Sequence, residues 1–148
     1  MTTFTSNEQI DKSKIWPTGL AAIGLSLVAN LLAYFILNAV LDLPSPAEFP
    51  PLSAAAIGIM TVLFTFLAVV AFVVVVRMAK RPLRTYRIVA TVVFVLSIIP
   101  NIISAVNPAA APFPFPAASA SGFLVLIIFH VIAYLIMVWL LTTKTGKT

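Results

Sequence analysis

Four long apolar stretches, separated by short segments that hold nearly all of the charge, form the pattern of this chain. Crossing a bilayer takes roughly 20 apolar residues in a helix, because about 30 Å of hydrocarbon must be spanned at about 1.5 Å per residue. In lipid a lone strand would leave its backbone N–H and C=O groups unpaired, so even the Val-rich second stretch is expected to be helical. The pattern therefore predicts an all-α polytopic membrane protein, with four transmembrane helices in an up-down bundle. The expected spans are approximately residues 18–41, 53–76, 87–106 and 122–141.

Composition supports the same class of protein. The 148 residues are 61% hydrophobic and only 9% charged, with a mean hydropathy of +1.13, whereas a soluble domain is about 25% charged. This length fits a single domain over residues 1–148. The absence of cysteine excludes thiolate nucleophiles and cysteine-bound metal. The sequence pI near 10.0 does not indicate nucleic-acid binding, because no soluble segment is long enough to form a reading module.

The basic residues lie on one side of the predicted membrane. Four spans place the tails 1–17 and 142–148 on the same side as the segment RMAKRPLRTYR, and all nine Lys and Arg residues fall in these three regions. In the opposite loops, 42–52 and 107–121, the only charged residues are Asp42 and Glu48. Positively charged loops stay in the cytoplasm, so both termini are predicted to be cytoplasmic in a cell (plasma) membrane. The basic segment contributes Arg77, Lys80, Arg81, Arg84 and Arg87.

Several local features extend this prediction. Trp16, Tyr86 and Trp139 are expected at the cytoplasmic interface, where amphipathic rings prefer to lie. The polar residues 1–15 are expected to be flexible, and Pro82 is expected to keep the turn between the second and third spans from becoming helical. The basic cluster could also bind anionic lipid head groups, although membrane topology already accounts for it.

Proline is concentrated in the two outer loops, which are expected to be extended rather than helical. Shifting the chain by 66 residues aligns Phe49-Pro50 with Phe115-Pro116 and Ser53-Ala54 with Ser119-Ala120, without a gap. This alignment suggests two repeated hairpins, although both loops are rich in Ala and Pro, which weakens the comparison.

Polar side chains within the spans are the candidates for function. Asn30, Thr61, Ser97 and His130 lie at similar depths in the outer half of the bundle, and Asn30, Ser97, Asn101 and His130 are the residues expected to form a polar layer there. Packing between helices explains most such residues, because Ser, Thr and Asn form hydrogen bonds across helix interfaces. His130 is the only histidine, and a titratable group at membrane depth is a functional candidate. Pro100 is expected to kink the third span and to free a backbone carbonyl.

Catalytic chemistry finds little support in these residues. There is no Gly-x-Ser-x-Gly nucleophile motif, no acidic residue inside a span and no second histidine for a metal or haem. No catalytic, cofactor-binding or metal-binding residue is therefore predicted, and the chain is not expected to be an enzyme.

The stretches RPLRTYR before the third span, LSIIPN within it and FHVIAY in the last span resemble a bacterial family of small four-helix integral membrane proteins. That family is known as a domain of unknown function, and the resemblance covers residues 18–141. It implies a four-helix membrane protein and implies no activity, cofactor or catalytic residue.

The sequence thus favours a non-catalytic accessory, assembly or structural component of a bacterial membrane. The expected partners are the lipid bilayer and either further copies of the chain or a larger membrane complex, with no nucleic acid and no specified small-molecule substrate. The alternative is a small transporter or channel, which could be oligomeric and would use the polar layer around His130.

Overall fold

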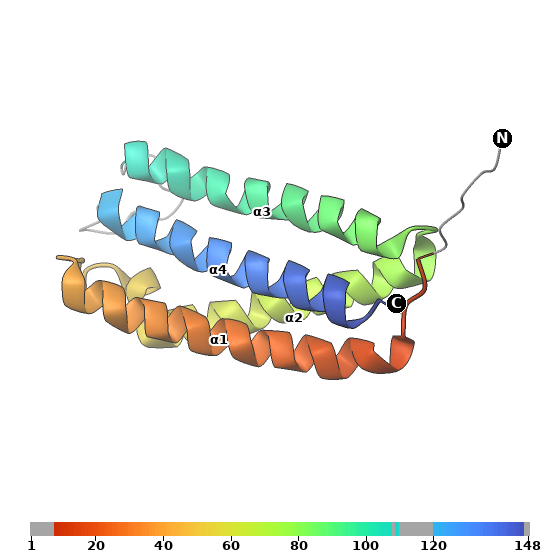
Figure 1. The fold of residues 1–148 in the computed structure, drawn as a ribbon. Helices are drawn as coiled ribbons and strands as arrows, with labels where there is room; N and C mark the ends of the chain where they lie inside the picture. Colours follow the sequence, from red (N-terminus) through yellow and green to blue (C-terminus); the bar gives the residue numbers. More distant parts are fainter. Residues whose placement is uncertain (1–7, 108, 110–119, 147–148) are drawn as a thin grey trace.

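Four long helices make up the computed structural model, which describes residues 8–107, 109 and 120–146. They are α1 (Ile15–Val40), α2 (Ala54–Met78), α3 (Pro82–Val106) and α4 (Ala120–Lys144). Two short 3-10 helices, η1 (Lys12–Lys14) and η2 (Pro50–Leu52), precede α1 and α2. Successive helices run in opposite directions (Figure 1). The predicted all-α, up-down bundle of four helices is confirmed.

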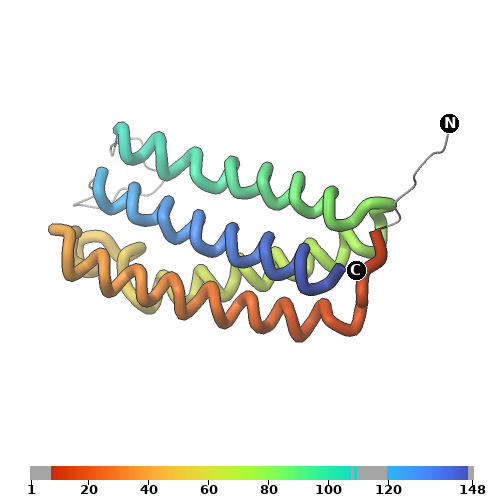
Figure 2. The backbone as a smooth tube through the Cα atoms, in the orientation of Figure 1, coloured from red at the N-terminus to blue at the C-terminus, as the bar shows by residue number. Residues whose placement is uncertain are grey.

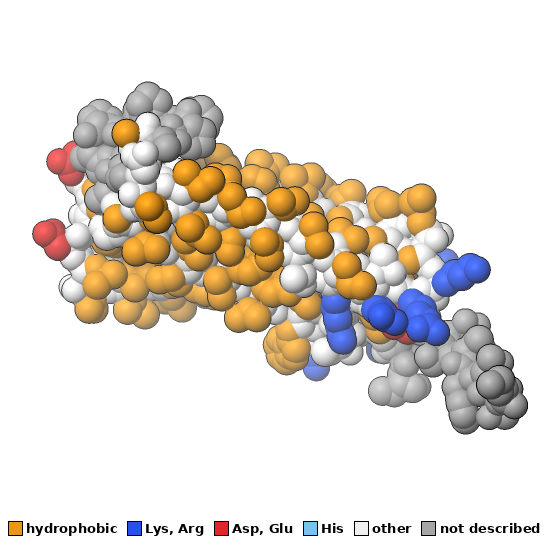
Figure 3. Space-filling view, turned by 90° about the horizontal axis from the view of Figure 1, so that it is seen from above, with side chains coloured by type: hydrophobic (Ala, Val, Ile, Leu, Met, Phe, Trp, Pro, Cys, Tyr) orange, Lys and Arg blue, Asp and Glu red, His pale blue; other side chains and the backbone are white. Residues whose placement is uncertain are grey.

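Each helix is long enough and apolar enough to cross a membrane. Helices of 25 or 26 residues extend about 37 Å at about 1.5 Å per residue. Large hydrophobic side chains also cover the outside of the bundle (Figure 3), including Leu20, which is 63% exposed, and Phe64, which is 60% exposed. In water such a surface would associate or aggregate, whereas in a bilayer it faces hydrocarbon. The protein is a multi-pass membrane protein.

The third helix begins earlier than the predicted span. Pro82 occupies the first turn of α3, where its missing N–H costs nothing and its fixed φ suits a helix. The turn between the two helices, residues 79–81, is non-helical as expected, but Pro82 begins α3 instead of lying within the turn. Arg84 and Arg87 belong to α3 and Arg77 to the last turn of α2. Of the predicted basic loop, only Lys80 and Arg81 lie between the two helices.

Charge is separated between the two ends of the bundle. In Figure 3 the blue Lys and Arg side chains gather at one end, here named the charged end, where α2 meets α3. Asp42 and Glu48 lie in the loop between α1 and α2, at the opposite end, here named the proline end. This separation is the pattern that the sequence predicted, while the side of the membrane that each end faces stays a prediction.

The three expected interface aromatics differ in their surroundings. Trp16 and Trp139 are 50% and 56% exposed, as side chains in contact with lipid should be. Tyr86 is only 1% exposed and packs edge-on against Phe72, with ring centroids 4.8 Å apart. Tyr86 is therefore not a lipid-facing ring, because its face of α3 turns toward α2 and contributes to the core, while its depth relative to the membrane interface stays a prediction.

The interior is filled by two separate hydrophobic clusters. The charged-end core and the proline-end core each combine residues from at least three segments of the chain. Helix α4 packs along both α1 and α3, and α1 packs along α2, whereas α2 and α3 approach one another much less closely. The charged-end core consists of Ile15, Ala22, Val69, Phe72, Tyr86, Met137 and Leu141. The proline-end core consists of Tyr34, Phe49, Leu52, Ile57, Phe123, Val125 and Phe129.

The two ends of the described chain meet at the charged end (Figure 2). Ile10 and Gly146 form an isolated antiparallel bridge, and the backbone N–H of Asp11 donates to the carbonyl of Thr145 at 2.8 Å. Glu8 accepts a hydrogen bond from the backbone N–H of Leu83 at 2.7 Å. The expected flexible tail is therefore docked from Glu8 onward, and residues 1–7 lie outside the described part of the chain.

The first outer loop is compact rather than fully extended. Phe49 is completely buried and packs against Phe123, with ring centroids 5.1 Å apart, and η2 follows it directly. Proline is compatible with such a turn, because its fixed φ lies close to helical values. Most of the second outer loop lies outside the described residues, including the positions 115, 116 and 119 that the predicted repeat aligns with the first loop.

Candidate binding cavity

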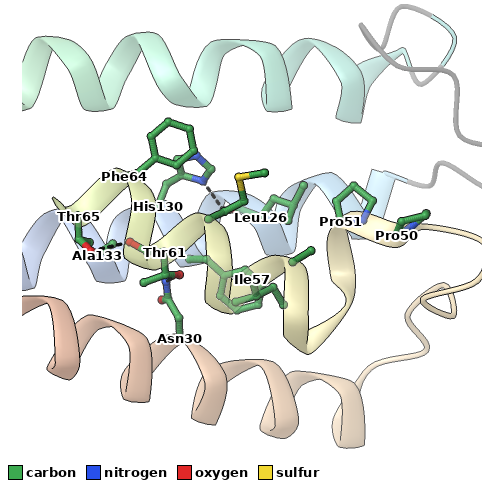
Figure 4. Close-up of a pocket in the computed structure, with 13 residues that line it drawn as sticks. Asn30, Pro50, Pro51, Ile57, Thr61, Phe64, Thr65, Leu126, His130 and Ala133 are labelled. Atoms are coloured by element: carbon green, nitrogen blue, oxygen red, sulfur yellow. Dashed lines mark hydrogen bonds between the residues drawn. The ribbon is translucent and has the colours of Figure 1, made fainter. Parts of the chain in front are cut away.

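A cavity of about 370 Å³ lies between α2 and α4 in the half of the bundle nearer the proline end. Figure 4 shows its lining side chains, with Asn30 reaching up from α1 toward α2, and His130 and Leu126 standing on α4. Pro50 and Pro51 of η2 line it at the proline end. Ligand sites in proteins usually occupy about 300–1,000 Å³. The cavity therefore has the volume of a small-molecule site.

A buried hydrogen bond between helices forms part of the polar wall. The Nδ2 of Asn30 donates to the hydroxyl oxygen of Thr61 at 2.9 Å, joining α1 to α2. Asn30 is 2% exposed and Thr61 is 7% exposed. One turn later on α2, the hydroxyl of Thr65 donates to the carbonyl of Thr61. These three side chains give an otherwise apolar cavity a polar side.

Asn30 has a further polar atom that is not satisfied. Its Oδ1 is buried and accepts no hydrogen bond from the described residues. Leaving a buried acceptor unpaired costs about 1–3 kcal/mol. Ser26, Tyr86 and Ser104 also have buried hydroxyl groups without a partner in the described chain, but none of them lines this cavity. Asn30 alone combines an unpaired buried acceptor with a position in the cavity wall.

His130 presents the second free acceptor. Its Nδ1 lies 2.7 Å from the carbonyl oxygen of Leu126, one turn earlier on α4. A carbonyl can only accept, so Nδ1 must hold the proton of this bond. In the neutral ring the other nitrogen, Nε2, then has a free lone pair. The helix itself thus fixes the tautomer of His130.

The remaining lining is apolar and opens toward the side of the bundle. Ile57 and Phe129 are buried, whereas Met60 and Phe64 on α2 are 52% and 60% exposed. No residue of α3 lines the cavity, and none of the lining residues is an Asp, Glu, Lys or Arg. Because α3 stands away from α2, the cavity is open toward the surface that faces hydrocarbon.

The four residues of the predicted polar layer fall into two groups. Asn30 and His130 line the same cavity. Ser97 donates to the carbonyl of Phe94 at 2.7 Å, and Asn101 donates to the carbonyl of Ser97 at 3.2 Å, so both bond to their own helix. Neither lines the cavity. Helix α3 continues through Pro100 without interruption, and the kink at this residue stays a prediction.

Thr61, which the sequence places at the depth of Asn30, and Thr65 also line the cavity, although the predicted layer did not include them. Their spacing of four residues places both hydroxyl groups on one helical face, and that face turns out to meet Asn30 and the cavity. The spacing was visible in the sequence, but it did not indicate which neighbouring helix the face would meet.

Other polar contacts within the spans join α3 to α4. The hydroxyl groups of Thr91 and Tyr134 lie 2.7 Å apart, and Arg87 donates to the hydroxyl of Thr142 at 3.2 Å. In addition, the rings of Phe94 and Tyr134 stack with centroids 4.5 Å apart. These contacts fit a structural role. Within the described ranges, no three His, Cys, Asp or Glu side chains come together as a metal site would require.

Comparison with known proteins identifies a family. Residues 10–147 match the model of a family described as "Family of unknown function (DUF6069)". The match covers most of the chain, so the protein belongs to this family, and the resemblance drawn from its sequence is confirmed. No curated protein and no solved structure matches the chain.

Proposed function

We propose that this member of a family of unknown function is a non-catalytic protein of the plasma membrane that binds a small lipid-soluble molecule between α2 and α4. In this role it would serve as an accessory component, either as an oligomer or within a larger membrane complex. Both termini and the charged end would face the cytoplasm, following the positive-inside rule.

The lateral cavity between two packed cores is the observation that supports this proposal. The charged-end core fills the bundle on one side of the cavity with buried side chains such as Phe72 and Leu141. The proline-end core fills the other side with Phe49, Leu52 and Phe123. A molecule dissolved in the hydrocarbon could enter from the side, whereas an ion crossing the bundle along its axis would meet both cores. This arrangement favours binding over conduction.

The chemistry of the lining supports a non-catalytic role. General acid–base or nucleophilic catalysis needs a proton-transferring group oriented by a partner. His130 is oriented by the backbone carbonyl of Leu126, but the lining contains no Ser, Cys or Lys that it could activate as a nucleophile and no Asp or Glu that could act as a second acid or base. Asn30 and Thr61 can position a bound group through hydrogen bonds, which is sufficient for recognition.

A small transporter is the second candidate, because His130 and Asn30 share one cavity at membrane depth. A transporter would require a second copy of the chain to complete a pathway across the membrane, because the single bundle is packed with hydrophobic side chains on both sides of the cavity. Reconstitution into liposomes would separate the two candidates. Proton or solute flux that disappears in His130→Ala would favour the transporter.

Cavity binding can be tested with a long-chain alkyl diazirine that labels proteins from the lipid phase. In nanodiscs we expect it to modify the segments around Met60–Phe64 and Leu126–Ala133 above the level found on the lipid-facing side of α3. Ala133→Phe should fill the cavity and suppress this labelling. Ala39→Phe, on an exposed position of α1, is the matched control. Equal labelling of the cavity and of α3 would contradict the proposal.

The orientation can be tested separately, because the chain has no cysteine. Ala47→Cys lies in the exposed loop between α1 and α2, and Lys80→Cys lies between α2 and α3. An impermeant maleimide added to intact cells should label only the variant at position 47. Labelling only at position 80 would reverse the proposed topology.

A further inference from the structure

We infer that the ligand of the cavity is an uncharged amphiphile whose head group carries a hydroxyl. The hydroxyl donates to Nε2 of His130, and the apolar chain leaves between Met60 and Phe64. This inference depends on the proposed function, because it specifies what the same cavity binds.

The free nitrogen of His130 determines the direction of the hydrogen bond. The Nδ1 of His130 is engaged by the carbonyl of Leu126, which leaves Nε2 as an acceptor. The Oδ1 of Asn30 also has no partner in the described chain, but it is buried beneath the cavity surface. A head group that only accepts hydrogen bonds, such as an ether or a ketone, would leave Nε2 unsatisfied.

The uncharged lining of the cavity argues for a neutral head group. Burying an ion without a partner is far more costly than burying a hydroxyl that forms a hydrogen bond. None of the side chains that line the cavity is an Asp, Glu, Lys or Arg. The charged residues of the described chain lie instead at the two ends of the bundle (Figure 3). A carboxylate or an ammonium head group would therefore find no counter-ion among the residues that line the cavity.

The rest of the lining suits a hydrocarbon chain. Phe129 and Ile57 are buried beside the polar wall, and Leu126 and Ala133 continue the apolar surface along α4. Met60 and Phe64 stand at the open side and are largely exposed. A chain that leaves between them would pass directly into the surrounding lipid. Polar recognition thus occurs inside the bundle, while most of the ligand stays in hydrocarbon.

A pair of photoactivatable probes tests the head group. The first is a long-chain primary alcohol with a diazirine in its chain, and the second is the methyl ether of the same molecule, which has no donor. Both are added to the purified full-length protein in phosphatidylcholine nanodiscs, and labelled peptides are quantified by mass spectrometry. One hydrogen bond corresponds to a difference of about twofold to tenfold in binding. We therefore expect the alcohol to label the peptides around Met60–Phe64 and Leu126–Ala133 about twofold to tenfold more than the ether.

Variants assign the effect to its acceptor. His130→Ala should lower alcohol labelling toward the level of the ether and leave the ether unchanged. His130→Gln, which retains an acceptor, should preserve part of the preference for the alcohol. Asn101→Ala changes a polar residue of α3 outside the cavity and should have no effect. The helical circular dichroism of each variant confirms that the fold is intact.

The outcomes separate this inference from the proposed function. Equal labelling of the cavity by alcohol and ether would overturn the hydroxyl head group and leave cavity binding in place. Stronger labelling by the corresponding carboxylic acid would overturn the uncharged head group. If neither probe labels the cavity more than it labels the lipid-facing side of α3, both this inference and the proposed function are overturned.

Discussion

Asn30 on α1 donates a hydrogen bond to Thr61 on α2, with 2.9 Å between Nδ2 and the hydroxyl oxygen, and both side chains are buried. The bond fixes the rotation of the two helices about their axes, because each side chain reaches the other from only one face. It also gives the cavity its polar wall. Helix packing and the candidate site therefore depend on the same pair of residues.

The stability of the bundle should reflect this bond. Asn30→Ala and Thr61→Val should each destabilise the protein, and a double-mutant cycle should give a coupling free energy of about 0.6–1.7 kcal/mol, as for other hydrogen bonds between membrane helices. Unfolding by SDS in mixed micelles measures the free energy of unfolding of each variant, from which the coupling is calculated. Asn38→Ala is the control, because Asn38 lies on the same helix but is exposed. A coupling near zero would contradict the structural role of the bond.

The close approach of α1 and α2 near the charged end depends on Gly19. A Cβ atom at this position would lie 2.8 Å from Cγ1 of Val69, which is fully buried. Gly19→Ala should therefore destabilise the fold by about 1–3 kcal/mol through overpacking, and Val69→Ala in the same chain should relieve part of the clash. Thermal unfolding in detergent measures both effects.

Gly24 provides the matched comparison on the same helix. A Cβ at Gly24 meets nothing within 4 Å, so Gly24→Ala should be neutral or should stabilise α1 by up to about 1 kcal/mol through its higher helix propensity. Equal destabilisation by the two substitutions would show that the close contact with the side chain of Val69 is not the cause.

Glu8 should stabilise the start of α3. Its Oε2 accepts from the backbone N–H of Leu83 at 2.7 Å, and the N–H of Arg84 lies 3.4 Å away. The first N–H groups of a helix have no partner within the helix, and capping them is worth about 0.5–2 kcal/mol. Glu8→Ala should therefore accelerate hydrogen exchange at residues 83 and 84. Glu8→Gln, which keeps an acceptor oxygen, should have a smaller effect, and Gln9→Ala should have none.

Glu48 should titrate below the usual range for glutamate. Hydrogen bonds from the hydroxyl of Ser45 and then from its backbone N–H lower the pKa of this carboxyl. A lowered pKa in the folded protein means that the contact stabilises the loop above the ordinary glutamate pKa, and that this contribution is lost as the pH falls through the folded pKa. Ser45→Ala should raise the pKa of Glu48, measured by carboxyl carbon NMR in micelles. An unchanged pKa would contradict the assigned cause.

The sequence by itself determined the four helices, the membrane class and the separation of charge between the two ends of the bundle. These properties depend on position along the chain, because span length must match the bilayer and charge must remain outside it. They required no knowledge of which side chains touch. The same reasoning placed Asn30 and His130 at a common depth.

Only the tertiary structure decided which polar residues share a site. Helices α1, α2 and α4 are largely apolar, and although small and polar residues mark one face of α1 and α2, the sequence does not indicate which helix each face meets. The distance between α3 and α2 separates Ser97 and Asn101 from the cavity, while packing against α2 buries Tyr86. The cap formed by Glu8 on α3 joins residues 75 positions apart. Depth in the membrane follows from the chain alone, whereas contact follows from how the helices pack.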